Sequence, residues 1–468
     1  MQETQKLADW ACRLQRSEIP PHTVAKAKQC LLEYLSCALV ARHEKPAQLL
    51  MSTLAQLGGT PQVSVIGQVR KLSLDQAALV NGALGHIWEI DDTHRHTMSH
   101  PGESIIPAAL AVGEWLGKVD GTRVLEAIVI GYEVAIRICH ALSPSHLERG
   151  WHPTGTTNTF GAAAAAGRIL GLNTEQMAWA FGLAATQAAG TFCHIPERAM
   201  SKDLNPGKAA ANGILAALLA REGFTGSPTA LENEKGFART HADAFVPERI
   251  TEGLGEAFKI DEIAFKPYSC CRHCHASIEA LLRLRKAYEL TPELVRAIRV
   301  YLYPMAAWFV NDPAPFNKGT YGLKYSLQFN LALALVAGDG GMQKALFDVP
   351  YMQEMLLVPE VQANMGKVTV EVDPELAKEW PNKWPARVSV QLIDGREMEQ
   401  LIEYPLGEPE HPLAYAQLVD KFQRAGQGYL TECETNLVLE LIDNFEQPGS
   451  VARLMPLVSG EKNPGGTP

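Results

Sequence analysis

Apolar positions recur at helical spacing through most of the first 260 residues of the chain. The segments that carry this pattern are rich in alanine and glycine, which is typical of helices whose axes lie close together and whose apolar faces form a core. A helix is predicted to run from Ser73 toward Glu89, because Ser73 and Gln76 have the spacing of a capping box. The pattern therefore predicts a large helical domain.

The pattern changes near residue 263. Alternating, β-branched segments at 297–304, 367–373 and 386–395 predict strands. The last two look like strands joined by a loop, with Asp394-Gly395 as the next turn. Helical spacing returns at 323–338 and again after about residue 411.

These changes predict a mainly α fold, in which a large all-helical domain is interrupted by a smaller α+β domain. We expect residues 1–262 and 403–460 to form the discontinuous helical domain and residues 263–402 to form the inserted one. A length of 468 residues fits two or three domains.

Composition narrows the classes of function. The net charge of -10 argues against a nucleic-acid-binding protein and requires any anion site to be built locally. No leader-like or membrane-spanning apolar run is evident, and the nine cysteines are scattered. We therefore expect a cytoplasmic protein with reduced thiols and no membrane partner. No nucleotide-binding glycine motif is present.

Three short segments place a basic side chain just ahead of an alanine-rich helix. The side chains are those of His100, His152 and Lys202. In the third segment, Asn205 is the predicted N-cap and Pro206 the first helical residue. Helix N-termini offer unpaired N–H groups and the positive end of the helix dipole. Each residue alone is commonly structural, but the three together predict a site for a multiply charged carboxylate or phosphate.

A second cluster of chemically active side chains occupies residues 266–275. Cys270, Cys271, His273, Cys274 and His275 suggest zinc at first sight. These side chains follow one another too closely to surround one tetrahedral ion, and no second ligand pair follows, so no metal is expected. We expect instead that Lys266 and Arg272 face an anion and that His275 begins a helix.

A site of histidines, lysines and an arginine suits removal of a proton from a carbon next to a carboxylate. Such a reaction needs a positioned base and cationic stabilisation of the developing enediolate, and it needs no cofactor. Imidazole has an ordinary pKa of about 6.5, so we expect His100 to act as acid or base with support from His152. His94 and His96 are predicted to be surface or loop residues.

Four ordered motifs resemble those of the MmgE/PrpD family. They are EIDDTHRHTMSHPGESIIPAALA, GWHPTGTTNTFGAAAAAGRILGL, SKDLNPGKAAANGILAALLAREGFTG and FKPYSCCRHCHASIEA, and the resemblance extends from about residue 5 to 445. The family contains 2-methylcitrate dehydratases, cis-aconitate decarboxylases and an iminodisuccinate epimerase. The resemblance implies an all-helical domain, a smaller α+β lid domain, a homodimer and a metal-independent site between the domains.

The resemblance also implies which residues form the site. Thr93 matches the threonine of the family's Asp-Asp-Thr motif, and His100 and His152 match the histidines of two His-Pro elements. Lys202 matches a Ser-Lys lysine, and Lys266 matches the Lys-Pro lysine that begins the lid. With Glu89, these are the expected catalytic residues. The expected substrate-binding residues are Asp92, Arg272, Lys208, His275 and Tyr325.

Two positions depart from the decarboxylase members of the family. Glu89 stands where they carry Asp, and Phe329 stands where they carry an active-site Tyr, with Tyr325 one helical turn away. Both departures count against decarboxylation. The leading hypothesis is therefore a metal-independent carbon–oxygen lyase of the 2-methylcitrate dehydratase type, which acts on a small di- or tricarboxylate.

Other functions stay open on the sequence alone. An epimerase like iminodisuccinate epimerase and a decarboxylase of the cis-aconitate type would use the same scaffold. A hypothesis from another class is a non-catalytic helical dimer whose segment 270–275 binds a metal or senses redox state.

Overall fold

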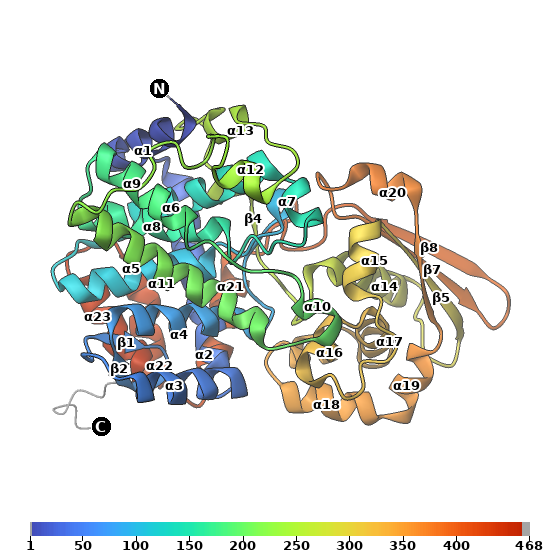
Figure 1. The fold of residues 1–468 in the computed structure, drawn as a ribbon. Helices are drawn as coiled ribbons and strands as arrows, with labels where there is room; N and C mark the ends of the chain where they lie inside the picture. The colour runs from blue at the N-terminus through green and yellow to red at the C-terminus, as the bar shows by residue number, and fades with distance from the viewer. Residues whose placement is uncertain (1, 461–468) are drawn as a thin grey trace.

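The computed structural model describes residues 2–460, which form a large helical body and a smaller lobe beside it (Figure 1). One hydrophobic cluster comprises residues between Leu7 and Phe265 and between Leu418 and Val458, together with Leu346 and Val349. A second cluster lies mainly between Tyr268 and Ile402. The chain thus leaves the body, builds the smaller lobe and returns. The predicted mainly α fold with a smaller α+β part is confirmed.

The helical body is built around α8, which is buried along nearly its whole length. Its alanine run, Ala162–Ala166, is fully buried, and α5, α6, α9 and α11 pack around it. Small side chains let these helix axes approach closely, as the alanine-rich sequence predicts. The helices of the body are α1 (Glu3–Arg13), α2 (Pro21–Ala41), α3 (Lys45–Leu57), α4 (Leu74–His86), α5 (Gly102–Leu116), α6 (Gly121–Leu142), α7 (Ser145–Glu148), α8 (Thr157–Leu170), α9 (Thr174–Ala185), α10 (His194–Glu197), α11 (Ser201–Arg221), α12 (Phe237–His241), α13 (Glu248–Thr251), α21 (Tyr415–Gly426), α22 (Glu432–Asp443) and α23 (Ser450–Ser459). None of the described helices is both long enough and apolar enough to cross a membrane.

The smaller lobe packs helices against a four-stranded sheet of order β6-β5-β7-β8. Its strands are β5 (Val295–Leu302), β6 (Val368–Val372), β7 (Ala386–Leu392) and β8 (Glu397–Ile402). Its helices are α14 (His275–Ala287), α15 (Pro304–Val310), α16 (Gly319–Tyr325), α17 (Leu327–Ala345), α18 (Val349–Leu357), α19 (Pro359–Met365) and α20 (Pro374–Glu379). Strand β5 runs parallel to β6 and antiparallel to β7, and α14 packs against β7 and β8.

The three predicted strands are confirmed as β5, β6 and β7, but their connections differ from the expectation. β6 and β7 are not neighbours, because β5 lies between them and the short helix α20 stands in their connection. The turn at Asp394-Gly395 joins β7 to β8, which completes the sheet.

Two predicted helix starts need correction. The capping box at Ser73 does not form, because the Ser73 hydroxyl donates to Asp75 and the Gln76 amide to the Gly58 carbonyl, although α4 itself is present. Helix α11 begins at Ser201, so Pro206 lies inside it.

The extra turn at the start of α11 is held by its side chains. Lys202 is paired with Glu89, and Asp203 accepts a hydrogen bond from Tyr321. These buried contacts fix the backbone ahead of Pro206, where Asn205 was predicted as the N-cap. Lys202 therefore lies within the first turn of the helix instead of ahead of it.

Two short strands join the body to the segment that leads into the smaller lobe. β3 (Thr93–His94) pairs antiparallel with β4 (Ile263–Ala264). A separate hairpin, β1 (Val63–Val65) with β2 (Gln68–Leu72), lies at the edge of the body. The β3–β4 pair places Thr93 beside the residues that precede Lys266, although these residues are far apart in sequence.

A buried lysine of the returning chain fixes this junction from the other side. The Lys421 ammonium of α21 pairs with Glu33 of α2, and it donates to the carbonyls of Ile90 at 2.6 Å and Lys266 at 3.1 Å. Burial raises the pKa of Glu33 to about 7, although the charge of Lys421 opposes that shift. The C-terminal helices thus complete the body and hold the loop that carries Glu89.

We predict that Gly407→Ala destabilises the protein by roughly 2–5 kcal/mol. Gly407 has a φ of 99°, and a Cβ there would lie 1.8 Å from the Phe265 carbonyl oxygen, which it cannot avoid. Gly428→Ala is the matched control: its φ is 74° and no atom lies within 4 Å of the added Cβ. It should cost about 1–2 kcal/mol. Urea unfolding of both variants measures the difference, and equal losses would contradict the steric argument.

Candidate active site

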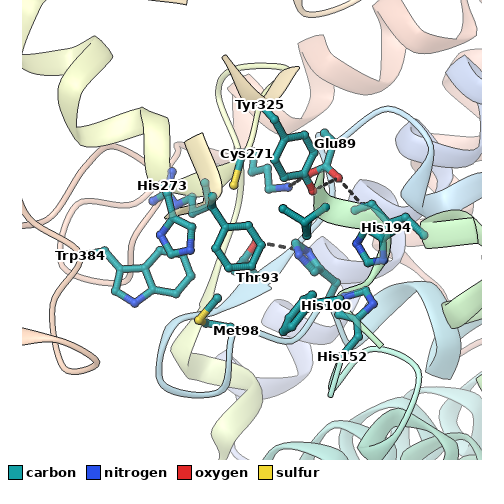
Figure 2. A pocket seen from close by; sticks show the side chains of 16 residues that line it. Glu89, Thr93, Met98, His100, His152, His194, Cys271, His273, Tyr325 and Trp384 are labelled. Carbon is teal, nitrogen blue, oxygen red and sulfur yellow. Dashed lines mark hydrogen bonds and ion pairs between the residues drawn. The ribbon is translucent and has the colours of Figure 1, made fainter. Parts of the chain in front are cut away.

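A pocket lies where the helical body meets the smaller lobe. Figure 2 shows its side chains converging from both parts. The body contributes Glu89, Thr93, Met98, His100, His152, Phe192, His194, Ile195 and Lys202; the leading segment and the smaller lobe contribute Lys266, Cys271, Arg272, His273, Phe309, Tyr325 and Trp384. The lining combines ionisable side chains with apolar ones, such as Phe192 against His152 and Trp384 against His273.

The Glu89 carboxylate is bound by side chains from three separate parts of the chain. It pairs with the Lys202 ammonium of α11, accepts from the Lys266 ammonium at 3.1 Å, and accepts from the Tyr325 hydroxyl of α16 at 2.9 Å (Figure 2). Burial alone would raise the pKa of Glu89, but Lys202 and Lys266 outweigh burial and hold it well below its ordinary value. Glu89 is therefore ionised at neutral pH.

The backbone at Glu89 is itself unusual. Helix α4 ends at His86, short of the predicted end, and Glu89 has a φ of 55°, in the left-handed region that few residues other than glycine adopt. Such strain persists where surrounding contacts over-determine the conformation. The two lysines and Tyr325 supply those contacts.

Asp91 forms a second charge centre beside the first. Its carboxylate contacts His86 at 2.6 Å, His100 at 2.9 Å and the Lys266 ammonium at 3.0 Å. Burial would raise the pKa of Asp91, but His100 and Lys266 hold it well below the ordinary value. Lys266 thus bridges Glu89 and Asp91, and the charges of these two carboxylates raise its pKa although burial opposes the shift.

His100 is held by its Nδ1 atom. This atom lies 2.7 Å from the Asp92 carbonyl oxygen and 2.9 Å from the Asp91 carboxylate, so it carries a proton and donates to them. In the neutral ring Nε2 then bears a lone pair at the pocket. The Thr93 hydroxyl lies 3.4 Å from Nδ1 (Figure 2). His100 is thereby oriented as a proton acceptor toward the pocket.

His152 has the opposite orientation. The side-chain amide of Asn205 donates to its Nδ1 at 2.8 Å, so the neutral ring carries its proton on Nε2. Burial, with His194 and His86 adding to it, holds the pKa of His152 well below the ordinary value. His152 is therefore a neutral hydrogen-bond donor.

His194 is a pocket residue that sequence reasoning missed. Its Nδ1 donates to the Thr191 carbonyl at 3.0 Å, and its buried Nε2 has no hydrogen-bond partner among the described residues. Burial, reinforced by Lys202, lowers its pKa to about 4, so Nε2 is an unused acceptor. A single histidine in "TFCHIPE" carries no motif that could have identified it.

His273 and the apolar wall were also missed as pocket residues. His273 stacks on Trp384 with ring centres 4.3 Å apart, and its Nδ1 lies 2.5 Å from the Tyr303 hydroxyl oxygen. Burial, with Lys266 and His100 adding to it, lowers the pKa of His273 to about 3. The apolar lining residues are Met98, Phe192, Ile195, Phe309 and Trp384. In sequence these residues are indistinguishable from ordinary core.

Eight of the residues that the sequence predicted line one pocket. They are Glu89, Thr93, His100, His152, Lys202, Lys266, Arg272 and Tyr325. Arg272 also lines it, yet its guanidinium already donates to Glu408 at 2.8 Å and to the carbonyls of Pro405 and Leu406. Phe329 is fully buried in the core of the smaller lobe, and Tyr325 is the tyrosine at the pocket.

Three predicted substrate-binding residues lie outside the pocket. Asp92 is buried behind His100, where Tyr132 and the Gly102 amide bind its carboxylate. His275 begins α14 as predicted and lies behind Arg272, at 2.9 Å. Lys208 is exposed, because six residues along α11 from Lys202 correspond to about 240° of rotation and turn it away.

The prediction that His94 is a surface or loop residue is wrong. His94 is buried in β3, and its ring contacts the Thr97 hydroxyl and the Glu262 carboxylate, each at 2.9 Å. His96 is partly exposed, with a longer contact of 3.8 Å to Glu262. Both histidines lie outside the pocket lining.

Two groups in the described part of the chain have metal-ligand spacing: His86, Asp91 and His100, and His94, His96 and Glu262. In both groups a lysine already holds the carboxylate. The Lys266 ammonium lies 3.0 Å from Asp91, and that of Lys259 lies 2.6 Å from Glu262. A metal cation at either place would be repelled by that ammonium charge. The arrangement therefore favours a network of ion pairs.

Comparison with known proteins finds similarity along nearly the whole chain. The family models of the MmgE/PrpD N-terminal and C-terminal domains match residues 5–249 and 268–447. A cis-aconitate decarboxylase-like protein of Aspergillus oryzae is 27% identical over 98% of this chain and 97% of its own length. Human cis-aconitate decarboxylase is 27% identical over 83% of this chain and 80% of its own length. The 2-methylcitrate dehydratase of Escherichia coli K12 is 24% identical over 85% of this chain and 84% of its own length.

We predict that Lys266→Met lowers the free energy of unfolding by roughly 3–5 kcal/mol, because it leaves two buried carboxylates with one ammonium fewer. Lys378→Met is the control. Lys378 forms an exposed ion pair with Glu375, in which 69% of the Lys378 side chain and 76% of the Glu375 side chain are accessible. This pair should contribute at most about 1 kcal/mol.

Adding Asp91→Asn to Lys266→Met should recover part of this loss, since it removes one of the stranded charges. Chemical denaturation of the unchanged protein, the two single variants and the double variant measures each free energy of unfolding. A Lys266→Met loss no larger than that of Lys378→Met would show that the buried pairs do not hold the site.

Proposed function

The chain belongs to the MmgE/PrpD family, and we propose that it is a lyase of the 2-methylcitrate dehydratase type that acts on a small di- or tricarboxylate. One observation carries the proposal: the pocket holds an imidazole with a free acceptor nitrogen, His100, and one with a free N–H, His152. Elimination of water needs such a base and a hydrogen-bond donor at the leaving hydroxyl group, together with cations near the developing charge.

Substrate carboxylates are bound by the cationic side of the pocket. Lys202 and Lys266 supply the charge, and Thr93 supplies a hydroxyl. Because Glu89 and Asp91 neutralise these lysines, an incoming carboxylate must share an ammonium with Glu89. A charge-assisted contact of this kind is worth about 1.5–3 kcal/mol. Glu89 thus sets how strongly the pocket attracts anions.

His100 is the base in the proposed reaction. Its Nε2 takes the proton from the carbon next to a carboxylate, and Asp91 stabilises the resulting imidazolium through Nδ1. The enediolate charge develops near the lysine ammonium groups. Glu89 is a poorer base, because its carboxylate is already stabilised by two ammonium groups.

His152 completes the elimination. Its Nε2–H donates a hydrogen bond to the leaving hydroxyl group, and the proton that His100 took from carbon is delivered to that hydroxyl group. Water then departs, a carbon–carbon double bond forms, and His100 is again neutral. His194 accepts a hydrogen bond from a substrate hydroxyl or protonated carboxyl through its unused Nε2. The apolar wall holds the carbon skeleton.

A decarboxylase acting on cis-aconitate is the second candidate function. Two observations favour it: the decarboxylase-like relative matches more of the chain than the dehydratase does, and Tyr325 lies in the pocket. In that reaction carbon dioxide leaves, and a histidine N–H protonates the carbanion. Epimerisation would return the proton to the opposite face of the same carbon.

We also propose a cytoplasmic homodimer. Leu204 and Leu215 are exposed on the same side of α11 as Lys208, which provides an apolar strip suited to a second copy. All nine cysteines are free, which suits a reducing compartment. Light scattering on the purified protein measures the oligomeric state.

Product analysis tests the proposed reaction. The purified protein is incubated separately with 2-methylcitrate, citrate, cis-aconitate and iminodisuccinate, and the products are separated by mass and chirality. We expect loss of water from 2-methylcitrate. Release of carbon dioxide from cis-aconitate alone would replace dehydration by decarboxylation, and inversion without change of mass would indicate epimerisation. No turnover of any of the four would contradict the proposal.

We predict that His100→Gln lowers turnover by about 10²–10⁴-fold, the usual contribution of general acid–base catalysis, and changes thermal stability little. Glutamine keeps a donor for Asp91 but cannot take the proton. His96→Gln is the control, because His96 lies near the same loop, outside the pocket, and should retain turnover. Steady-state kinetics and thermal melting provide both readouts. A fully active or an unfolded His100→Gln variant would remove His100 from the mechanism.

A further inference from the structure

A larger, open cavity lies outside the active pocket, at the junction of the helical body and the smaller lobe. Its volume is about 400 Å³. The start of α3, the end of α10 with the residues after it, and α16 with the residues before it form its walls. In Figure 1, α10 extends from the body toward α16 at this junction. Nothing in the proposed reaction uses this cavity.

Arg198 is the unusual residue of the cavity wall. Its side chain is only 7% exposed, and its Nη2 atom donates to the Phe309 carbonyl at 3.1 Å. The Nε and Nη1 atoms are buried and have no hydrogen-bond partner among the residues that the structure describes. Buried guanidinium nitrogens are normally hydrogen-bonded, so these two N–H groups are free to donate to an acceptor oxygen.

Two contacts hold the Arg198 guanidinium in place. It lies over the Tyr325 ring, 4.7 Å from the ring centre, and it donates to the Phe309 carbonyl. Its nearest carboxylate is Asp312, at 3.7 Å, which is already bound by the Lys318 ammonium at 2.8 and 2.9 Å. One carboxylate thus serves two cations, and positive charge is left over.

Lys324 adds a second poorly satisfied cation to the same wall. It is buried, its ammonium contacts the Ile87 carbonyl at 3.4 Å, and it lies over the Trp88 ring at 4.7 Å. Burial lowers its pKa to about 8, with Glu89 acting in the opposite direction, so it is mostly protonated at neutral pH.

The charge balance of the whole cavity is positive. Arg198, Lys45, Lys318 and Lys324 line it, and the only carboxylates among its lining residues are Glu44 and Glu197. A local excess of positive charge is notable in a chain whose net charge is -10. The cavity therefore has the sign, the size and the unpaired donors that a small anion requires.

A narrow space lies between this cavity and the active pocket. It shares Arg198 and Tyr321 with the outer cavity, and it shares His194, Lys202 and Tyr325 with the pocket. The two spaces are therefore neighbours separated by a few side chains.

We propose that the outer cavity is a second binding site for a small di- or tricarboxylate, in which Arg198 holds one carboxylate through Nε or Nη1 and the Lys324 and Lys318 side chains balance the rest of the charge. The site is distinct from the pocket around His100. Its occupation does not depend on which reaction that pocket performs.

The test uses tricarballylate, a tricarboxylate that has neither a hydroxyl group to lose nor a carbon–carbon double bond. Calorimetric titration of the full chain should show two sites. Arg198→Gln should weaken one of them by about tenfold or more, the usual effect of losing a charge-assisted contact. Arg13→Gln, which changes an exposed arginine on α1, is the control and should leave both sites unchanged.

Further variants and a crystal structure complete the test. Should Arg198→Gln fold poorly by circular dichroism, Arg198→Lys and Lys318→Gln take its place, with weakening of the same site expected. A crystal grown with tricarballylate should show a carboxylate within hydrogen-bond distance of Arg198. A single site confined to the His100 pocket, or unchanged affinity in all three variants, would overturn the proposal. Tighter binding of inorganic phosphate than of tricarballylate at this site would overturn its assignment to carboxylates.

Discussion

The carboxylates of Glu89 and Asp91 are buried, and each needs a cationic partner because an unpaired charge in the interior is costly. The partners come from distant parts of the chain: Lys202 from α11 and Lys266 from the segment that leads into the smaller lobe. The pairing can form only when both parts are in place. The contacts that stabilise the two buried carboxylates are therefore the same contacts that assemble the pocket.

The same charges decide the protonation of the histidines around them. Burial together with neighbouring cations keeps His86, His152 and His194 neutral, so each ring has one donor and one acceptor nitrogen. The partner of Nδ1 then fixes which nitrogen donates: Nδ1 of His194 donates to the Thr191 carbonyl, and Nδ1 of His152 accepts from the Asn205 amide. Similar side chains acquire opposite roles from their surroundings.

Much of the pocket could be predicted from sequence, because His100, His152 and Lys202 each stand in a recognisable setting at a helix start. Glycine-rich and alanine-rich helices and alternating strands likewise predicted the architecture. His194 could not be found this way, since only the tertiary fold brings that isolated histidine to the pocket. Lys208 was misplaced because its orientation depends on where α11 begins, and buried contacts ahead of Pro206 moved that start by a turn.

The pair between Glu33 and Lys421 links residues 388 positions apart and has a consequence for synthesis. At translation rates of about 5–20 residues per second, Lys421 is made roughly 20–80 s after Glu33. During that interval the growing chain has its N-terminal helices but lacks the helix that covers them. The nascent body must therefore wait on the ribosome with an uncovered apolar face, which is the kind of surface that chaperones bind.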